Sequence, residues 1–127
     1  MPMDVPDPTN PPHYRRAHEH PSGVECIEMV RHMPFCLGNA VKYLYRAGHK
    51  GSSAEDYRKA AWYLRKQAED IRQLASIPEH TLEPLRRWAN ATAGEPIVLV
   101  SLCLVAGTRT HLLMAANECE RIARGEP

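Results

Sequence analysis

The sequence has no apolar run long enough to cross a membrane as a helix. Its longest run, Ile97 to Ala106, falls far short of the roughly 20 residues that such a helix needs. The N-terminal stretch MPMDVPDPTNPP also lacks the apolar segment of a signal peptide. These absences favour a cytoplasmic protein.

A strong charge of either sign is missing, and so is any close pairing of cysteines. The formal net charge is +1, which gives no global basic field, so we expect no general nucleic-acid binding. Any basic site must be local. The four cysteines, at positions 26, 36, 103 and 119, form no C-x-x-C pair. We therefore expect reduced thiols rather than a disulfide framework.

Familiar nucleotide-binding and metal-binding motifs are absent as well. The chain contains no Walker A sequence, no G-x-G-x-x-G and no H-E-x-x-H. Its seven histidines form no zinc-ligand pattern with the cysteines. A phosphate site would therefore need a different arrangement of cations, and we expect no structural metal.

Helical periodicity is the main positive signal, in a chain long enough for one domain. Residues 1–12 contain five prolines, and we expect an extended arm and loop over 1–22. Residues 23–76 should form the core helices. These are a helix from Gly23 to just before Pro34 and one from Pro34 to about Ala47. A long third helix, with a capping signal at Ser52 and Ser53, runs to about Ser76.

The region 77–127 should add further helices to the same compact unit. Residues 79–94 suggest a short helix with Pro84 near its start, and 108–125 show a clear amphipathic pattern. Residues 95–107 suit either a buried strand or a buried helix, and we favour a helix because a lone strand would have no partner. The predicted fold is all-α, a small helical bundle built on an antiparallel helical hairpin with an extended N-terminal arm.

The second and third helices each show a stripe of polar and aromatic residues opposite an apolar back. At about 100° per residue, the first stripe consists of Asn39, Lys42, Tyr43 and Arg46. The second consists of Asp56, Lys59, Trp62, Tyr63 and Lys66. The connection between the helices is short, so they should be antiparallel neighbours that place Arg46 near Asp56 and Lys59.

Two such stripes suit a nucleotide. Arginine and lysine bind phosphate oxygens, and tyrosine and tryptophan offer faces on which a base stacks. The start of the third helix would add free N–H groups near Lys50. The candidate ligand or phosphate contacts are Asn39, Lys42, Arg46, Lys50 and Lys59, and the candidate stacking rings are Tyr43, Trp62 and Tyr63. The simpler alternative is a solvated face or a subunit interface.

Four segments also resemble a family of phage proteins. They read NPPHY (10–14), GVECIE (23–28), GNAVKYLYRAGHKG (38–51) and DYRKAAWYL (56–64). In order and spacing they are similar, over roughly residues 10–69, to the SaV-like or nucleotide-kinase family, whose function is largely unknown. The resemblance implies a mainly helical phage protein that acts in the cytoplasm of the infected bacterial host. It also adds His13 to the ligand contacts and Tyr14 to the stacking rings.

One characterised member of that family phosphorylates deoxynucleoside monophosphates without a P-loop, so a nucleotide kinase is the leading expectation. A kinase would need ATP and magnesium, with Glu25, Glu28 and Asp56 as candidate metal ligands; no other cofactor is expected. Two alternatives stay open. One is a non-catalytic sponge that sequesters a nucleotide-derived signal of a bacterial anti-phage system, and the other is a module that binds a host protein.

The apolar faces of Ile97–Ala106 and of the last helix predict a homo-oligomer.

Overall fold

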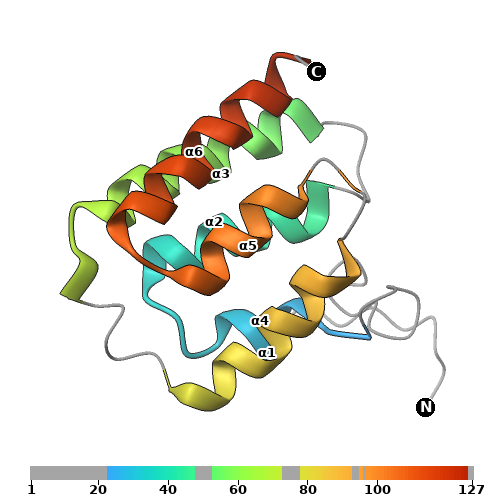
Figure 1. Cartoon of the computed structure of the whole chain (residues 1–127), viewed down its shortest axis with the longest axis vertical. Helices are drawn as coiled ribbons and strands as arrows, with labels where there is room; N and C mark the ends of the chain where they lie inside the picture. Colours follow the sequence, from blue (N-terminus) through green and yellow to red (C-terminus); the bar gives the residue numbers. More distant parts are fainter. Residues whose placement is uncertain (1–22, 48–52, 73–77, 93–94, 96, 126–127) are drawn as a thin grey trace, which may run out of the picture.

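The fold is seen in a computed structural model that describes residues 23–47, 53–72, 78–92, 95 and 97–125 (Figure 1). The described residues contain six α-helices: α1 (Cys26–Val30), α2 (Phe35–Ala47), α3 (Ser53–Ala68), α4 (Glu79–Ala91), α5 (Val98–Ala106) and α6 (Arg109–Ala123). They include no β-strand, so the predicted all-α class is confirmed. The predicted arm over 1–22 lies outside the described residues.

Helices α2 and α3 form the predicted antiparallel hairpin. Leu37, at the start of α2, contacts Gln67 at the end of α3, whereas Arg46 near the end of α2 lies beside Asp56 near the start of α3. Helix α3 also packs against α6, which packs against α5; α4 then joins α5 to α1 (Figure 1). Among the described helices, α3 is therefore supported by α6, while Phe35 of α2 and Trp62 of α3 are exposed on another side of the hairpin.

The core consists of the apolar backs of these helices. Fully buried side chains include Val41 and Leu44 of α2, Leu64 of α3, Trp88 of α4 and Leu112 of α6. The amphipathic pattern predicted for residues 108–125 is confirmed, because one side of α6 is buried through Leu112, Ala115, Ala116 and Cys119. The Tyr45 hydroxyl donates a buried 2.7 Å hydrogen bond to the Val24 carbonyl, which ties the chain before α1 to α2.

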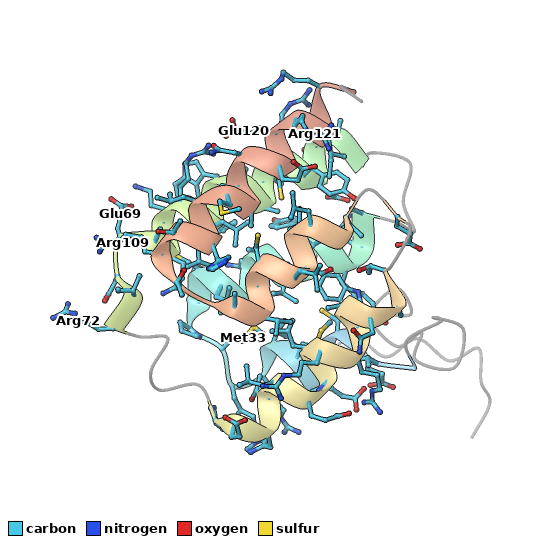
Figure 2. All side chains as sticks on the ribbon, viewed as in Figure 1. Met33, Glu69, Arg72, Arg109, Glu120 and Arg121 are labelled. Carbon is cyan, nitrogen blue, oxygen red and sulfur yellow. The ribbon has the colours of Figure 1, made fainter. Side chains whose placement is uncertain are left out.

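Helix α3 ends at Ala68, so the prediction that it continues to about Ser76 was wrong. The Gln67 side chain donates through Nε2 to the Asp70 carbonyl at 2.9 Å, while its Oε1 accepts the Leu37 N–H at 3.1 Å. Arg109, labelled in Figure 2, donates through Nε to the Ala68 carbonyl at 2.9 Å. Arg109 therefore satisfies from a distance one of the carbonyls that have no partner within α3 at its end. Ile71, which lies beyond this helix end, is exposed.

Two other predicted boundaries also differ from the structure. Helix α1 is a short Cys26–Val30 segment rather than a helix from Gly23 to Pro34. Pro84 lies inside α4, which begins at Glu79, rather than near its start. A proline has no N–H to donate to the carbonyl four residues back, yet α4 continues through Pro84, which is buried.

Residues 98–106 form helix α5, which settles the ambiguity between strand and helix in favour of the helix. Gly107 ends it with φ +67°, and its N–H donates to the Cys103 carbonyl. This left-handed conformation suits glycine because it has no Cβ to clash with the preceding turn. None of the described helices has the length and apolar character to span a bilayer.

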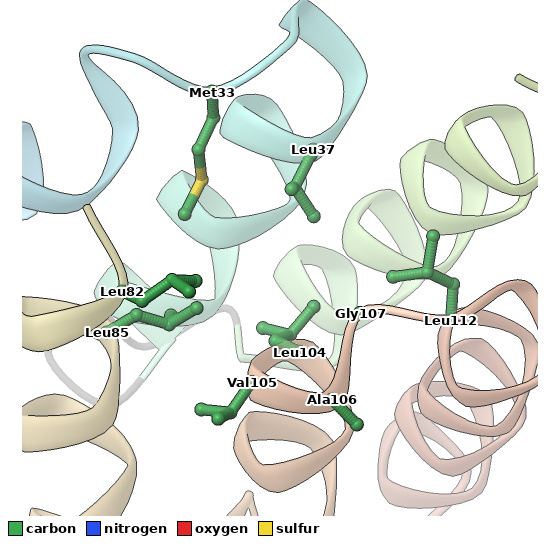
Figure 3. Close-up of a pocket in the computed structure, with 9 residues that line it drawn as sticks. All are labelled: Met33, Leu37, Leu82, Leu85, Leu104, Val105, Ala106, Gly107 and Leu112. Atoms are coloured by element: carbon green, nitrogen blue, oxygen red, sulfur yellow. The ribbon is translucent and has the colours of Figure 1, made fainter. Parts of the chain in front are cut away.

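An apolar pocket of about 190 Å³ lies where α2, α4, α5 and α6 converge (Figure 3). Its lining side chains come from Met33, Leu37, Leu82, Leu85, Leu104, Val105, Ala106 and Leu112, with Gly107 beside them. No charged side chain lines this pocket. It therefore offers nothing to a phosphate, and a site for an anion must be sought elsewhere.

Candidate functional site

The two predicted stripes lie side by side on the open face of α2 and α3. We call this surface the basic aromatic face and define it by Phe35, Asn39, Lys42, Tyr43, Arg46, Asp56, Lys59, Trp62, Tyr63 and Lys66. The predicted approach of Arg46 to Asp56 is confirmed, with 3.7 Å between Arg46 Nε and Asp56 Oδ2. The hairpin thus brings residues from both helices into one surface.

Asp56 is the one deeply buried charged group of this face, with 4% of its surface exposed. Its Oδ2 and the Arg46 Nε are both buried, and within the described part of the chain neither has a hydrogen-bond partner. Their separation is just longer than a hydrogen bond. A buried donor and acceptor left unsatisfied in this way are uncommon, and they mark a polar spot under the face.

Aromatic rings form the centre of the face. The rings of Tyr43 and Tyr63 stack across the two helices, with centroids 6.0 Å apart and an interplanar angle of 15°. Trp62 meets Tyr63 edge-on at 5.0 Å and 87°, and Phe35 does so at 6.2 Å and 77°. Phe35 is 75% exposed and Trp62 is 56% exposed, so both offer open ring surface to a ligand.

Phe35 is a member of the face that the sequence interpretation missed. The signal was present, because Phe35 comes four residues before Asn39 and eight before Tyr43, on the same helical stripe. Phe35 lies at the first turn of the helix, directly after Pro34, where the sequence indicates a helix start rather than a binding residue. Its exposure shows that it does not serve the core.

Lysines surround these rings. The ammonium groups of Lys42 and Lys59 lie 4.9 and 5.4 Å from the Tyr43 ring centroid, and that of Lys66 lies 5.3 Å from the Trp62 centroid. The only other lysine of the chain is Lys50. Such ring contacts are individually weak at exposed sites, so they position the ammonium groups without holding them against a stronger anion.

The cations differ in how far carboxylates already neutralise them. Lys59 Nζ lies 3.0 Å from Glu55 and Lys66 Nζ lies 3.5 Å from Glu69. The hydrogen bond between Glu55 and Lys59 lowers the pKa of Glu55 and raises that of Lys59. Lys42, in contrast, forms no ion pair with any residue that the structure describes. Lys42 is therefore the cation most available to an added anion.

Lys42 also lies near the buried thiol of Cys26. Burial raises the pKa of Cys26 to about 12, and the positive charge of Lys42 opposes that rise. The thiol therefore stays neutral and does not neutralise the charge of Lys42. All four cysteines are free.

The three predicted metal ligands are not brought together. The Glu28 carboxylate accepts the Glu25 N–H at 2.6 Å in a capping arrangement at the start of α1, and it lies 3.9 Å from Arg87 Nη2. Asp56 instead faces Arg46. Among residues whose placement is described, no group of three or more histidine, cysteine, aspartate or glutamate side chains could hold a metal ion.

The remaining predicted residues are placed only in part. Asn39 is half-buried on α2 among the other face residues. His13, Tyr14 and Lys50 lie outside the described residues. The described site therefore rests on α2 and α3 alone.

Comparison with known proteins finds a similarity over part of this chain. A family model whose description is a protein of unknown function, DUF3310, matches residues 9–65. That is just under half of the chain, and it agrees in extent with the resemblance noted over roughly 10–69. The matched segment includes α1, α2 and most of α3, hence most of the basic aromatic face. No curated protein and no solved structure matches the chain.

Proposed function

We propose that the basic aromatic face binds a nucleotide or a nucleotide-derived ligand. The observation that supports this most directly is the joining of open rings and cations on one surface. Trp62 is exposed beside the Tyr43–Tyr63 stack, and each of three lysines lies within 5.4 Å of a ring centroid. A base stacks on such rings, and ammonium groups beside them attract its phosphate.

The polar groups of the face have distinct roles in this proposal. Lys42 contacts the phosphate, since no described carboxylate competes for it. Arg46 and Asp56, whose buried Nε and Oδ2 lie 3.7 Å apart, support the face from below rather than touching the ligand. Trp62 takes the base.

Binding without phosphate transfer is the form of this function that we favour. A nucleoside monophosphate kinase must hold the triphosphate of ATP and a second phosphate with magnesium. The cations here are few and mostly paired, and Glu25, Glu28 and Asp56 do not converge. A sponge for a nucleotide-derived signal needs no such cluster. Kinase activity in a phage protein remains the alternative, and it rests on the resemblance alone.

Calorimetry tests the binding proposal. Wild-type protein is titrated with deoxynucleoside mono-, di- and triphosphates, ADP-ribose and cyclic dinucleotides. We expect saturable binding of at least one of them, weakened by about 1–3 kcal/mol in Trp62→Ala and by about 1.5–3 kcal/mol in Lys42→Ala. Leu102→Ala, which removes an exposed apolar side chain of α5, serves as the matched control. Absence of binding across the whole panel would overturn the proposal.

A coupled assay separates the two forms of the function. The same monophosphates are supplied with ATP and magnesium, and ADP release is followed. We expect no turnover above the Lys42→Ala variant. Turnover that depends on Lys42 would instead establish the kinase.

We also propose that the chain self-associates through α5 and α6. Four large apolar side chains of this hairpin are exposed: Leu99, Leu102, Leu113 and Met114. Scattered exposed apolar residues are normal, but four on two neighbouring helices favour an interface. Because this surface belongs to α5 and α6, a homo-oligomer formed through it leaves the face of α2 and α3 open.

A further inference from the structure

The face offers two separate stacking positions. Phe35 and Trp62 are its most exposed rings, and each stands nearly perpendicular to the same ring, Tyr63. Their centroids are therefore separated by no more than the sum of 6.2 and 5.0 Å. Phe35 comes from α2 and Trp62 from α3, so the hairpin holds the two rings as one platform. A single base uses only one of these positions.

The charge of the face is low for the ring area that it offers. Arg46, Lys59 and Lys66 each have a carboxylate partner, whereas Lys42 has none in the described part of the chain. A nucleoside triphosphate carries several negative charges on its phosphates for a single base. A phosphodiester-linked strand carries one charge for each base. Successive bases of a single strand stack on neighbouring aromatic side chains beside cations, so rings and lysines arranged as on this face suit the strand better.

We propose that the ligand is a short single-stranded oligonucleotide segment, with two consecutive bases stacked on Phe35 and Trp62. The terminal phosphate contacts Lys42, the bridging phosphodiester passes over Tyr63, and Lys66, whose ion pair with Glu69 is solvent-exposed, supplies a second cation on the Trp62 side. This inference rests on the proposed function and names its ligand class. It also revises the expectation, drawn from a net charge of +1, that nucleic acid is not bound: the relevant charge is local, and stacking supplies most of the affinity.

The test compares one base with two. Affinities are measured by calorimetry for deoxyadenosine and deoxythymidine monophosphates and for the corresponding 5′-phosphorylated dinucleotides, with wild type, Phe35→Ala and Phe35→Tyr. We expect the dinucleotides to bind about 5- to 150-fold more tightly than the monophosphates. Phe35→Ala should abolish that advantage, so that the dinucleotides bind no more tightly than the monophosphates, while Phe35→Tyr, which keeps a ring, should restore it.

Salt dependence gives an independent readout. For a single strand, log K falls with log salt by about 0.7 per phosphate contact, so Lys66→Gln should reduce the slope for the dinucleotide by about that amount. Arg72→Gln is the control, because Arg72 is a 92% exposed cation outside the face. An unchanged slope in Lys66→Gln would overturn the assigned phosphate contact.

The two proposals fail in different ways. If monophosphates and dinucleotides bind equally, or if Phe35→Ala weakens both to the same degree, the two-base ligand is overturned while the nucleotide site stands. If none of these probes and none of the wider nucleotide panel binds, the proposed function itself is overturned. A dinucleotide advantage that depends on Phe35 supports both.

Discussion

At the scale of single residues, the polar side chain of Gln67 is buried and connects two helices through hydrogen bonds. It is 2% exposed, and its amide joins the first turn of α2 to the end of α3. The N–H groups of a first turn have no partner within their own helix. Gln67 therefore sets the register of the hairpin that aligns Phe35 with Tyr63.

Replacing Gln67 with methionine should destabilise the fold by about 1–3 kcal/mol, because a buried Leu37 N–H loses its acceptor. Equilibrium urea unfolding measures the change. Arg58→Ala, an exposed substitution on the same helix, should stay within about 0.5 kcal/mol of wild type. Equal stability of Gln67→Met and Arg58→Ala would contradict this assignment.

The cysteines should differ sharply in reactivity. Burial raises the pKa of Cys26 and of Cys119 to about 12, and burial also raises that of Cys103. A raised pKa leaves the thiol protonated at pH 8, and the thiolate is the reactive form. Cys36 is half-buried on α2.

Titration with a chromogenic disulfide at pH 8 should therefore show one fast thiol, lost in Cys36→Ser, and three that react only after denaturation. Fast labelling of Cys26 or Cys119 in the native protein would show that α1 or α6 opens readily.

At the scale of helices, the sequence interpretation succeeded where periodicity decides the outcome. The bodies of α2, α3 and α6 follow an apolar back, and two stripes on neighbouring helices were enough to predict that Arg46 meets Asp56. It failed where a distant contact decides. Nothing near Ala68 in sequence signals that Arg109 caps α3 there. Likewise, Pro84 is buried inside α4, although the sequence places it near the start of that helix.

The end of α5 gives a prediction at this scale. Gly107 has φ +67°, which costs a residue with a Cβ about 1–2 kcal/mol. A Cβ at this position would meet only ordinary contacts, the nearest being the Leu104 carbonyl at 3.7 Å, so the cost arises from the backbone conformation. Gly107→Ala should therefore lower the free energy of unfolding by about that amount, and Gly107→Asn should lower it less. Thermal unfolding measures both, and equal effects would contradict the conformational explanation.

At the scale of the whole molecule, α3 links two surfaces. One side of it contributes Lys59, Trp62 and Tyr63 to the basic aromatic face, and another packs against α6, where Arg65 binds Glu120 and Asn117. Self-association through α5 and α6 would therefore stabilise the bundle behind the face without covering it.

Light scattering tests that association. Wild-type protein should show a mass above that of the 14.3 kDa chain. Leu102→Glu should shift the mass towards that of the monomer. Because Leu102 is 51% exposed, a carboxylate there stays solvated in the monomer, whereas burying it in an apolar interface is unfavourable. Ile27→Glu, at another exposed apolar position, is the control. A monomeric wild type at all concentrations would rule the interface out.

The central claim is that the face of α2 and α3 binds a nucleotide, and the two tryptophans allow the most direct test. Trp62 is exposed on the face, whereas Trp88 is buried in α4. In a ¹H–¹⁵N spectrum each gives one indole N–H signal, assigned with Trp62→Phe. On titration with deoxynucleotides and dinucleotides, the account predicts that the Trp62 signal shifts and saturates together with amides of α2 and α3, while the Trp88 signal stays in place. Ligand-dependent shifts confined to α5 and α6, or no shift with any nucleotide, would contradict it.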